Sequence, residues 1–348
     1  MKKVVHLIST DVFSGAENVA CQIIDIFKED QNYEMLYASR INSNLEPLKM
    51  RNIKYYELKK FNLHYVRKMI KEVKPDIIHA HDIRASIIAS LLKSKNIKIV
   101  SHVHANHMNM RKLNLKTTLY QLVSKKFSSI IWISNSAYEN YYFKKKVKEK
   151  SKIIYNIISI ENLLKKVQNS NIKENYDIIY LGRLVYQKNP LRIIEIVKKI
   201  KEKKSNIKVA IVGDGELNDI CREKIAQYNL QNNIIMYGFI NNPYEILYNS
   251  KIMIMTSRYE GTPMCALEAI ALGKPIVSTP TDGIIDIVKD GETGYLSNDD
   301  NILSEKILEL LTDEEKYKRF CDKTKENSFY MNDIEKYRKD INSIYEKK

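Results

Sequence analysis

The chain has 348 residues, and 44% of them are hydrophobic. A chain of this length is longer than a single hydrophobic core usually supports, so we expect two globular domains. No apolar run approaches the roughly 20 residues of a membrane-spanning helix, and the short run near the N-terminus is interrupted by His6 and lacks a cleavage pattern, which indicates a buried strand and not a signal peptide. Four cysteines without zinc or redox spacing are expected to be reduced core residues of a cytoplasmic protein: Cys21, Cys221, Cys265 and Cys321.

The net charge of +15 is concentrated in the first half of the chain. Residues 1–166 carry 30 lysines and arginines against 14 acidic residues, whereas the remainder is balanced at 27 against 28. This asymmetry indicates that the first half faces something anionic, although a lysine-rich chain with many Ile, Asn and Tyr residues is also typical of a genome-wide composition bias. No nucleic-acid-binding motif or arginine-rich segment is present, so we do not expect a nucleic-acid partner.

In the first half, short apolar runs alternate with helical segments. Continuous apolar strands separated by helices are typical of a parallel sheet covered on both faces, so the sequence predicts a doubly wound α/β domain. The predicted strands lie at residues 3–9, 33–39, 76–81, 97–104 and 129–134, with helices at residues 16–29, 63–73 and 85–94.

The pattern fades over the polar, asparagine-rich residues 157–175 and then restarts. New strands are predicted at residues 176–182, 207–213, 233–238, 251–257 and 275–279. We therefore expect two Rossmann-like, doubly wound domains facing across a cleft. The expected parts are an N-terminal domain at 1–165, a C-terminal domain at 166–325, and a C-terminal helix at 326–348 that packs back on the first domain.

Candidate binding residues lie just after strands, where ligands of such sheets bind. Gly15, in FSGAEN, would let the backbone approach a phosphate, although a glycine turn before a helix is also ordinary structure. Arg183 and Lys188, in YLGRLVYQKNP, could neutralise a diphosphate or be two surface cations. The turn VGDGEL carries Gly213, and MYGF places Phe239 where a planar base could be met.

The stretch EGTPMCALE holds two glutamates eight positions apart. Thr262 is predicted as an N-cap and Pro263 as the first helical residue, and the following apolar run carries the helix to Gly273. Glu260 then lies on the loop before the helix and Glu268 inside it. Because a helix N-terminus presents unpaired amides that suit an anion, the arrangement predicts one acid on each side of a bound phosphate ester.

With these motifs in order, the second half resembles the donor-binding domain of glycosyltransferase family four, a retaining family with the GT-B fold. The matching pieces span about residues 177–296: LGRLVYQKNP, VGDGEL, YGF, SRYEGTPMCALEAIALGKPIVST and DGETGYL. The first half is matched more loosely, by SGAE, DIIHAHD and VSHVHAN. The chain most resembles bacterial enzymes that build capsular, exopolysaccharide or other cell-surface glycans. It departs from the family pattern at Ile157, where glycine is frequent.

The resemblance implies that residues 1–165 form an acceptor-binding domain and residues 166–325 a nucleotide-sugar-binding domain. It also implies a role for each candidate in the second half. Arg183 and Lys188 would neutralise the diphosphate, Glu268 would accept hydrogen bonds from the ribose hydroxyls, and Phe239 would contact the base. Gly213 belongs to the same donor-binding set. Glu260 would hold the donor sugar and its phosphate together with the backbone around Gly261, Thr262, Pro263 and Met264.

In the first half, the resemblance implies that Gly15 closes on the diphosphate. His104 matches a family histidine near the reacting sugar, and it completes the expected catalytic set with Glu260, Arg183 and Lys188. His102 and His107 offer rival alignments for this histidine. For His79 and His81, in DIIHAHD, a purely structural role at the strand end is the alternative.

The leading interpretation is a metal-independent, retaining glycosyltransferase of the hexosyltransferase type. It would move a sugar from a UDP-sugar, or another nucleotide-diphosphate sugar, to a glycan or lipid-linked acceptor in cell-surface polysaccharide synthesis. We expect no cofactor, because no paired-aspartate metal pattern is present and Arg183 and Lys188 would replace the metal. Two alternatives stay open, namely a UDP-sugar 2-epimerase of the same fold and a non-catalytic GT-B glycan-binding subunit.

The densest basic cluster is YYFKKKVKEKSK, at residues 141–152. It combines Tyr141, Tyr142 and Phe143 with six lysines. Aromatic rings beside a lysine run suit a peripheral contact with the anionic inner face of the cytoplasmic membrane, where a lipid-linked acceptor would lie. The alternative is a solvated, lysine-rich helix end.

Overall fold

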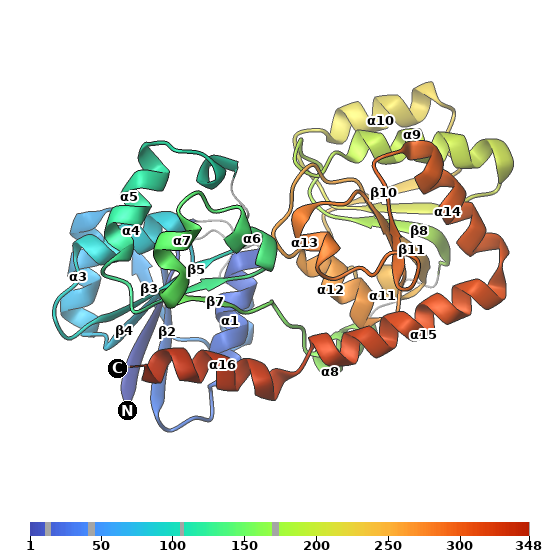
Figure 1. Ribbon diagram of the computed structural model, residues 1–348. Coiled ribbons are helices and arrows are strands. Elements are labelled where there is room, and N and C mark those ends of the chain that lie inside the picture. The colour runs from blue at the N-terminus through green and yellow to red at the C-terminus, as the bar shows by residue number, and fades with distance from the viewer. Residues whose placement is uncertain (11–14, 41–45, 105–107, 169–173, 348) are drawn as a thin grey trace. The chain divides into compact units, whose positions relative to one another are not determined.

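The computed structural model describes residues 1–10, 15–40, 46–104, 108–168 and 174–347. It divides the chain into two compact α/β units, the first made of Met1–Asn156 with Ile334–Lys348 and the second of Ile157–Asp333 (Figure 1). The prediction of two doubly wound, Rossmann-like domains is confirmed in its fold class, because each unit has its own parallel sheet and its own buried core.

The first unit is built on a seven-stranded, all-parallel sheet with the order β3-β2-β1-β4-β5-β6-β7. Its central strands are largely buried on both faces, as expected for a covered parallel sheet. The two edge strands, β3 and β7, were not predicted, because they are short and only partly buried. The strands are β1 (Lys2–Leu7), β2 (Tyr33–Arg40), β3 (Tyr55–Leu58), β4 (Ile77–Ala80), β5 (Lys98–Val103), β6 (Ser129–Trp132) and β7 (Ser151–Ile153).

Several helices of the first unit begin at a side-chain cap. The side chains of Asn62, Asp82, Asn114 and Ser134 each accept a hydrogen bond from the backbone N–H three residues on, which satisfies one of the unpaired donors at the helix start. The helices are α1 (Gly15–Ile26), α2 (Glu46–Met50), α3 (Leu63–Val73), α4 (Ile83–Leu91), α5 (Leu115–Ser124), α6 (Asn135–Glu139), α7 (Lys144–Val147) and α16 (Ile334–Glu346).

The last helix of the chain packs in the first unit, beside α1 (Figure 1). Tyr345 is fully buried there, and Asp340 pairs with Lys152 of β7 at 2.7 Å. The predicted C-terminal segment began at residue 326, but α15 (Glu314–Met331) belongs to the second unit, where it contacts α12. The segment that returns to the first unit is therefore shorter and starts at Ile334.

The second unit contains a six-stranded, all-parallel sheet with the order β10-β9-β8-β11-β12-β13. Its strands are β8 (Tyr176–Leu181), β9 (Val209–Val212), β10 (Ile234–Gly238), β11 (Ser250–Met255), β12 (Ile276–Ser278) and β13 (Gly294–Leu296). Its helices are α8 (Ile160–Gln168), α9 (Pro190–Lys203), α10 (Asn218–Gln227), α11 (Tyr244–Tyr248), α12 (Met264–Ala271), α13 (Asp282–Ile285), α14 (Asp300–Thr312) and α15.

The second unit begins earlier than predicted. The expected boundary lay at residues 165 and 166, whereas the structure places it after Asn156. The polar stretch that follows contains the amphipathic helix α8, whose Leu163 is buried in the core of the second unit together with Ile158. The sequence analysis took this stretch for a polar linker, although Ile160, Leu163, Leu164 and Val167 recur at helical spacing. Burial of Ile158 and Leu163 attaches the segment to the second unit.

In the second unit, the order of the strands creates a switch point between β8 and β11. From β8 the chain moves outward through β9 and β10, and it then returns to the other side of β8 as β11. In such sheets, ligands bind beyond the carboxyl ends of the strands where the order reverses. The loops that follow β8 and β11 are therefore the expected position of a binding site.

Candidate functional site

An ion pair joins the two loops at the switch point. The Nζ atom of Lys188, on the loop after β8, lies 2.5 Å from Oε1 of Glu260, on the loop after β11. The hydroxyl of Ser257 donates to the same carboxylate oxygen at 2.5 Å. The side chains of Lys188 and Glu260 are only 14% and 5% exposed, so the pair is largely withdrawn from water.

Backbone contacts hold these two loops together. The Nε2 atom of Gln187 donates to the carbonyl of Tyr259 at 3.0 Å, and the N–H of Arg258 donates to the carbonyl of Gln187 at 2.8 Å. Burial disfavours the charged form of Lys188, but the charge of Glu260 and its hydrogen bond outweigh this effect, so the pKa of Lys188 is raised. The lysine is therefore a fixed ammonium group in a poorly hydrated position.

Arg183 lies on the same loop as Lys188, and its side chain is exposed. Its carbonyl accepts a hydrogen bond from the hydroxyl of Tyr180 at 2.8 Å, and the next residue, Leu184, is fully buried, so the backbone at this point is anchored. Among the described residues, the guanidinium forms no ion pair within 4.0 Å. Its charge nevertheless acts against that of Lys188, which places the two predicted cations near one another.

Gly213 packs closely against the backbone of the loop that carries Arg183. Its φ angle is +134°, and a Cβ atom at this position would lie 2.0 Å from the carbonyl oxygen of Gly182. A Cβ atom at Gly215 would lie 2.5 Å from the carbonyl oxygen of Leu184. Both positions therefore require glycine for the packing of two loops. The structure gives Gly213 this packing role, and its contact with a donor stays a prediction.

The helix after Glu260 starts one residue later than predicted. Pro263 is the N-cap, with an extended backbone, and α12 begins at Met264, so the prediction of Thr262 as N-cap and Pro263 as first helical residue was wrong. Thr262 is buried, and Gly261 and Met264 are partly buried. The predicted end is confirmed, because Gly273 follows the helix with a φ angle of +69°, in the left-handed region.

A second helix fixes the loop before α12. At Gly283, in α13, a Cβ atom would lie 1.1 Å from the carbonyl oxygen of Gly261, so only glycine allows this close approach. The sequence analysis did not single out Gly283. Its position in the sequence TPTDGII gives a turn signal but no indication of the distant loop that it contacts.

Glu268 lies on the partly buried side of α12, where the hydroxyl of Tyr244 donates to its Oε1 atom at 3.0 Å. Burial raises the pKa of Glu268, against the opposing effects of the Tyr244 hydrogen bond and the charge of Lys166. Tyr244, on α11, was missed by the sequence analysis because nothing in the sequence relates α11 to α12.

Phe239 follows β10 and is 73% exposed, an unusual position for a phenylalanine.

Cys265 shows that the lysine and both glutamates lie around one point. Its thiol is on the first turn of α12, and burial raises its pKa to about 12. The charges of Lys188, Glu260 and Glu268 all act on this thiol. The structure therefore brings together the two glutamates that the sequence separates by eight positions.

The remaining predicted residues belong to the first unit. Gly15 is the exposed first residue of α1, and His104 follows β5 and is partly buried. The Nε2 atom of His104 lies 2.8 Å from Nδ1 of His81, and burial lowers the pKa of His104 to about 3. His79, His81 and His102 are buried within hydrogen-bonding distance of other side chains, as a structural role requires. The rival candidate His107 lies outside the described residues.

Two family models match the chain. The model described as Glycosyl transferases group 1 matches residues 163–327, and the model described as Glycosyltransferase Family 4 matches residues 29–162. An uncharacterised glycosyltransferase of Methanocaldococcus jannaschii is 32% identical over 236 residues, which are 62% of this chain and 58% of that protein. The capsular polysaccharide biosynthesis glycosyltransferase CapH of Staphylococcus aureus is 26% identical over 285 residues, 77% of this chain and 79% of that protein.

Solved structures share the fold over the whole chain. The structure of HepE from Anabaena, in complex with UDP and glucose, matches with a TM-score of 0.85 and 17% identity and covers 99% of both chains. The two family matches together include every predicted site residue except Gly15. The chain belongs to glycosyltransferase family four and resembles the members that build capsular polysaccharide.

Proposed function

We propose that the protein is a retaining glycosyltransferase that transfers a sugar from a UDP-sugar to a glycan or lipid-linked acceptor during the synthesis of a cell-surface polysaccharide. The observation that carries this proposal is the buried Lys188–Glu260 pair at the switch point, with Arg183 nearby and α12 directly behind it. The names of the relatives support it, since CapH acts in capsule synthesis and HepE binds UDP and glucose.

In this proposal, Lys188, Arg183 and the N-terminal amides of α12 stabilise the leaving diphosphate. Breaking the bond between the sugar and the nucleotide places growing negative charge on the leaving group. Fixed cations and helix amides aimed at that group stabilise the transition state more than the ground state. Lys188 is well suited to this role because its ammonium group is held in a poorly hydrated position and needs no rearrangement during the reaction.

The two glutamates would hold different parts of the donor. Glu260 is fixed by Lys188 and Ser257, so its second oxygen can accept a hydrogen bond from a hydroxyl of the transferred sugar. Glu268 lies one to two turns along α12, beside Tyr244, where it would accept from the ribose hydroxyls. Phe239 would offer its exposed ring to the base. For His104 and Gly15, which belong to the first unit, contact with the donor stays a prediction.

Metal independence and retention of configuration are parts of the proposal. The protein's own cations would take the place of a divalent ion at the diphosphate. Retention is what membership of family four implies, and it is tested by comparing the anomeric configuration of product and donor by NMR spectroscopy.

The experiment that tests the proposed activity measures UDP or GDP release across a panel of nucleotide sugars, in the presence of acceptor extracts. Release of UDP with transfer of labelled sugar supports the proposal. Conversion of a UDP-sugar to its 2-epimer, without need of an acceptor, would instead support the epimerase alternative. Glycan binding without turnover of any donor would support the non-catalytic subunit.

We also propose that the first unit contacts anionic membrane, through a surface that differs from the predicted cluster. Tyr141 is 1% exposed and packs against Trp132, so it was wrongly expected at the membrane. Lys152 pairs with Asp340, and Lys150 donates to backbone carbonyls. The remaining exposed lysines of this cluster include Lys145 and Lys146, on α7.

The neighbouring helix α5 supplies an apolar stripe beside these lysines, since α5 and α7 are in contact. Leu115, Leu119 and Leu122 recur at the spacing of one helix face and are 86%, 38% and 60% exposed, and Leu113 precedes them at 62%. We call this set, with Lys145 and Lys146, the α5–α7 surface. Exposed leucines beside lysines suit the interface of an anionic bilayer. Among the described residues, no helix is both long and apolar enough to cross a membrane.

A further inference from the structure

Five of the seven histidines of the chain lie together on one face of the first unit's sheet. His6 of β1 is the register partner of His79 of β4, so both side chains point to the same face. His81 follows two positions after His79, and His102 and His104 are likewise two positions apart at the end of β5. The period of two along each strand brings all five rings to this face.

The rings form two hydrogen-bonded strings. In the first string, His104 Nε2 lies 2.8 Å from His81 Nδ1, and His81 Nε2 lies 2.9 Å from His6 Nδ1. In the second string, the hydroxyl of Tyr345 lies 2.7 Å from His79 Nδ1, and His79 Nε2 lies 3.1 Å from His102 Nδ1. Among the described residues, three buried ring nitrogens have no hydrogen-bond partner: His6 Nε2, His102 Nε2 and His104 Nδ1.

Neutral imidazoles satisfy such strings only in part. Each neutral ring has one N–H donor and one nitrogen that accepts a hydrogen bond. A string of such rings therefore ends in a ring nitrogen without a hydrogen-bond partner. Burial lowers the pKa of His6 to about 3 and also brings the pKa values of His79 and His81 well below the usual value, with further contributions from neighbouring histidines for these two. The rings are therefore neutral at neutral pH, which is the form that binds metal ions without first releasing a proton.

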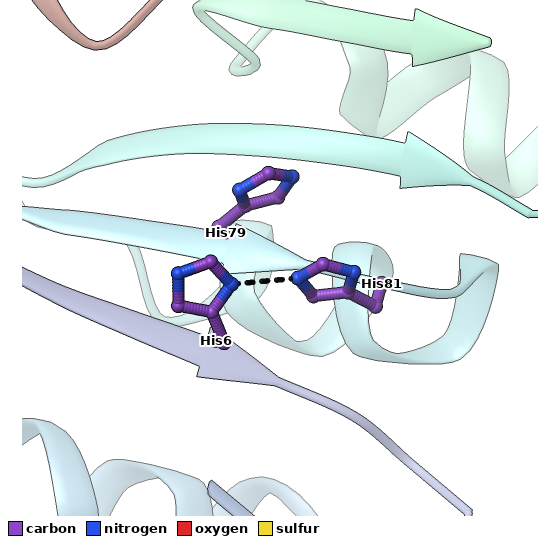
Figure 2. A group of neighbouring side chains, drawn as sticks. All are labelled: His6, His79 and His81. Atoms are coloured by element: carbon purple, nitrogen blue, oxygen red, sulfur yellow. Dashed lines mark hydrogen bonds between the residues drawn. The ribbon is translucent and has the colours of Figure 1, made fainter. Parts of the chain in front are cut away.

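We propose that His6, His79 and His81 bind a divalent transition-metal ion of the zinc class. Each of the three offers one ring nitrogen, and these nitrogens all lie within 4.8 Å of one another. Figure 2 shows the three rings close together, with the His6–His81 contact as a dashed line. No carboxylate belongs to the group, so imidazole-preferring ions are favoured over magnesium or calcium.

The distance between His6 and His81 requires only a small adjustment of these two rings. Zinc–nitrogen bonds of about 2.0–2.1 Å at tetrahedral angles place two ligand nitrogens about 3.4 Å apart. His6 Nδ1 and His81 Nε2, now 2.9 Å apart, would have to separate by about half an ångström, which side-chain rotation can provide. Three protein ligands leave a fourth position open for water.

Two of the three ligands already have a partner on the other ring nitrogen. Tyr345 orients His79 through Nδ1, and His104 orients His81 through Nδ1. Metal-binding histidines usually have their second nitrogen hydrogen-bonded in this way, which fixes the ring and its tautomer. The other nitrogen of His79, Nε2, would exchange its 3.1 Å contact with His102 Nδ1 for the ion. A second group, His81, His102 and His104, also lies within 4.8 Å, but it shares His81 and uses the partly exposed His104. We assign the ion to the inner group, whose three rings are fully buried.

The experiment uses the full chain, freed of metal with a chelator and then equilibrated with excess Zn²⁺ or Co²⁺. Bound ion is counted by elemental analysis after gel filtration, and the visible spectrum of Co²⁺ reports its ligands. We expect one ion per chain in the wild type, a cobalt spectrum typical of nitrogen ligation, and a higher Tm with zinc, because an ion that binds only the folded state stabilises it. This proposal does not depend on the proposed transfer activity.

Matched variants assign the ligands. His6→Asn and His79→Asn should weaken ion binding by more than about tenfold, and Tyr345→Phe by about tenfold, while His64→Asn, at an exposed histidine outside the group, should bind as the wild type does. Circular dichroism identifies the variants that fold. The proposal is overturned if the wild type binds no ion, if cobalt shows only oxygen ligation, or if folded His6→Asn and His79→Asn variants bind zinc normally. If the His→Asn variants do not fold, the wild-type stoichiometry, the cobalt spectrum and Tyr345→Phe still decide it.

Discussion

Lys188 and Glu260 lie 72 positions apart in the chain, and their side chains meet at 2.5 Å beyond the adjacent strands β8 and β11. The pair does two things at once. It closes a contact between two loops of the second unit, and it fixes an ammonium group where the proposed diphosphate would bind. Substitutions at the buried Lys188 and at the exposed Arg183 can therefore separate the effect of a lost charge on turnover from its effect on protein stability.

The first prediction concerns the two cations. Arg183→Ala and Lys188→Ala should each lower kcat by about a hundredfold, because each removes a fixed positive charge from the leaving group. Only Lys188→Ala should also unfold more readily, by about 3 kcal/mol, since it leaves the carboxylate of Glu260 buried without its partner. Replacement of an exposed loop residue such as Arg183 rarely destabilises a protein much, whereas Lys188 differs because its ion pair is buried.

Steady-state kinetics and urea denaturation measure the two effects. The double variant Lys188→Met/Glu260→Gln serves as a control, because it removes both charges and should recover much of the stability without recovering activity. Wild-type turnover in both single variants would remove the diphosphate role from these residues.

The second prediction separates the two glutamates. Glu268→Ala should weaken the binding of free UDP, because the ribose is present in both donor and product. Glu260→Ala should leave the affinity for UDP nearly unchanged but lower transfer by at least about a hundredfold, since its proposed partner is the sugar. Isothermal titration calorimetry with UDP, beside turnover assays, distinguishes them, and equal losses of UDP affinity in both variants would contradict this division.

The third prediction concerns pH. Burial raises the pKa of Glu268 above its ordinary value of 4.5. The folded state thus favours the neutral form of Glu268. The neutral carboxyl group leaves the free energy of unfolding at its full value below pH 4.5, and this contribution is lost as the pH rises through the raised pKa. Glu268→Gln, which keeps an oxygen for Tyr244, should therefore match the wild type in Tm below that pH and exceed it at neutral pH. Equal Tm values at neutral pH would show that ionisation of Glu268 does not destabilise the protein.

Much of the fold was predictable because the central strands are buried on both faces and thus read as largely apolar runs, as in Val209–Val212 and, apart from His79, Ile77–Ala80. The strands β3, β7 and β13 were missed because each is an edge strand of only three or four residues, too short to give a clear apolar run. Positions after strands located Arg183, Lys188 and Glu260. The contacts of Gly283 with Gly261 and of Tyr244 with Glu268 join distant segments, and no local pattern encodes them.

The fourth prediction is that transfer does not need a divalent ion. Turnover per folded molecule should be unchanged after chelation and unaffected by added magnesium or manganese, because Lys188, Arg183 and the α12 amides carry the phosphate charge. A loss of zinc from the histidine group is expected to lower Tm without lowering this rate, so both quantities are measured on the same sample. Activity that vanishes with chelator and returns with magnesium would contradict the prediction.

The last prediction tests the α5–α7 surface. Each lysine or arginine near an anionic bilayer contributes roughly 1 kcal/mol of attraction, so Lys145→Glu/Lys146→Glu should reduce vesicle binding by at least tenfold. Leu115→Ser/Leu122→Ser should reduce it without changing charge, because both leucines are exposed and would enter the headgroup region. Lys144 is left in place because it pairs with Glu139 at 2.6 Å. Lys203→Glu/Lys208→Glu, in the second unit, changes the net charge by the same amount and serves as the control.

Co-sedimentation is measured with vesicles that contain anionic lipid and with neutral vesicles, at low and high salt. Binding should require anionic lipid and weaken as salt rises, because the Debye length shortens from about 30 Å at 0.01 M to about 10 Å at 0.1 M salt. The control variant should bind as the wild type does, since its lysines lie outside the surface. If the wild type ignores anionic vesicles at low salt, or if the control loses as much binding as Lys145→Glu/Lys146→Glu, the α5–α7 surface does not contact membrane, and a freely diffusing glycan becomes the expected acceptor.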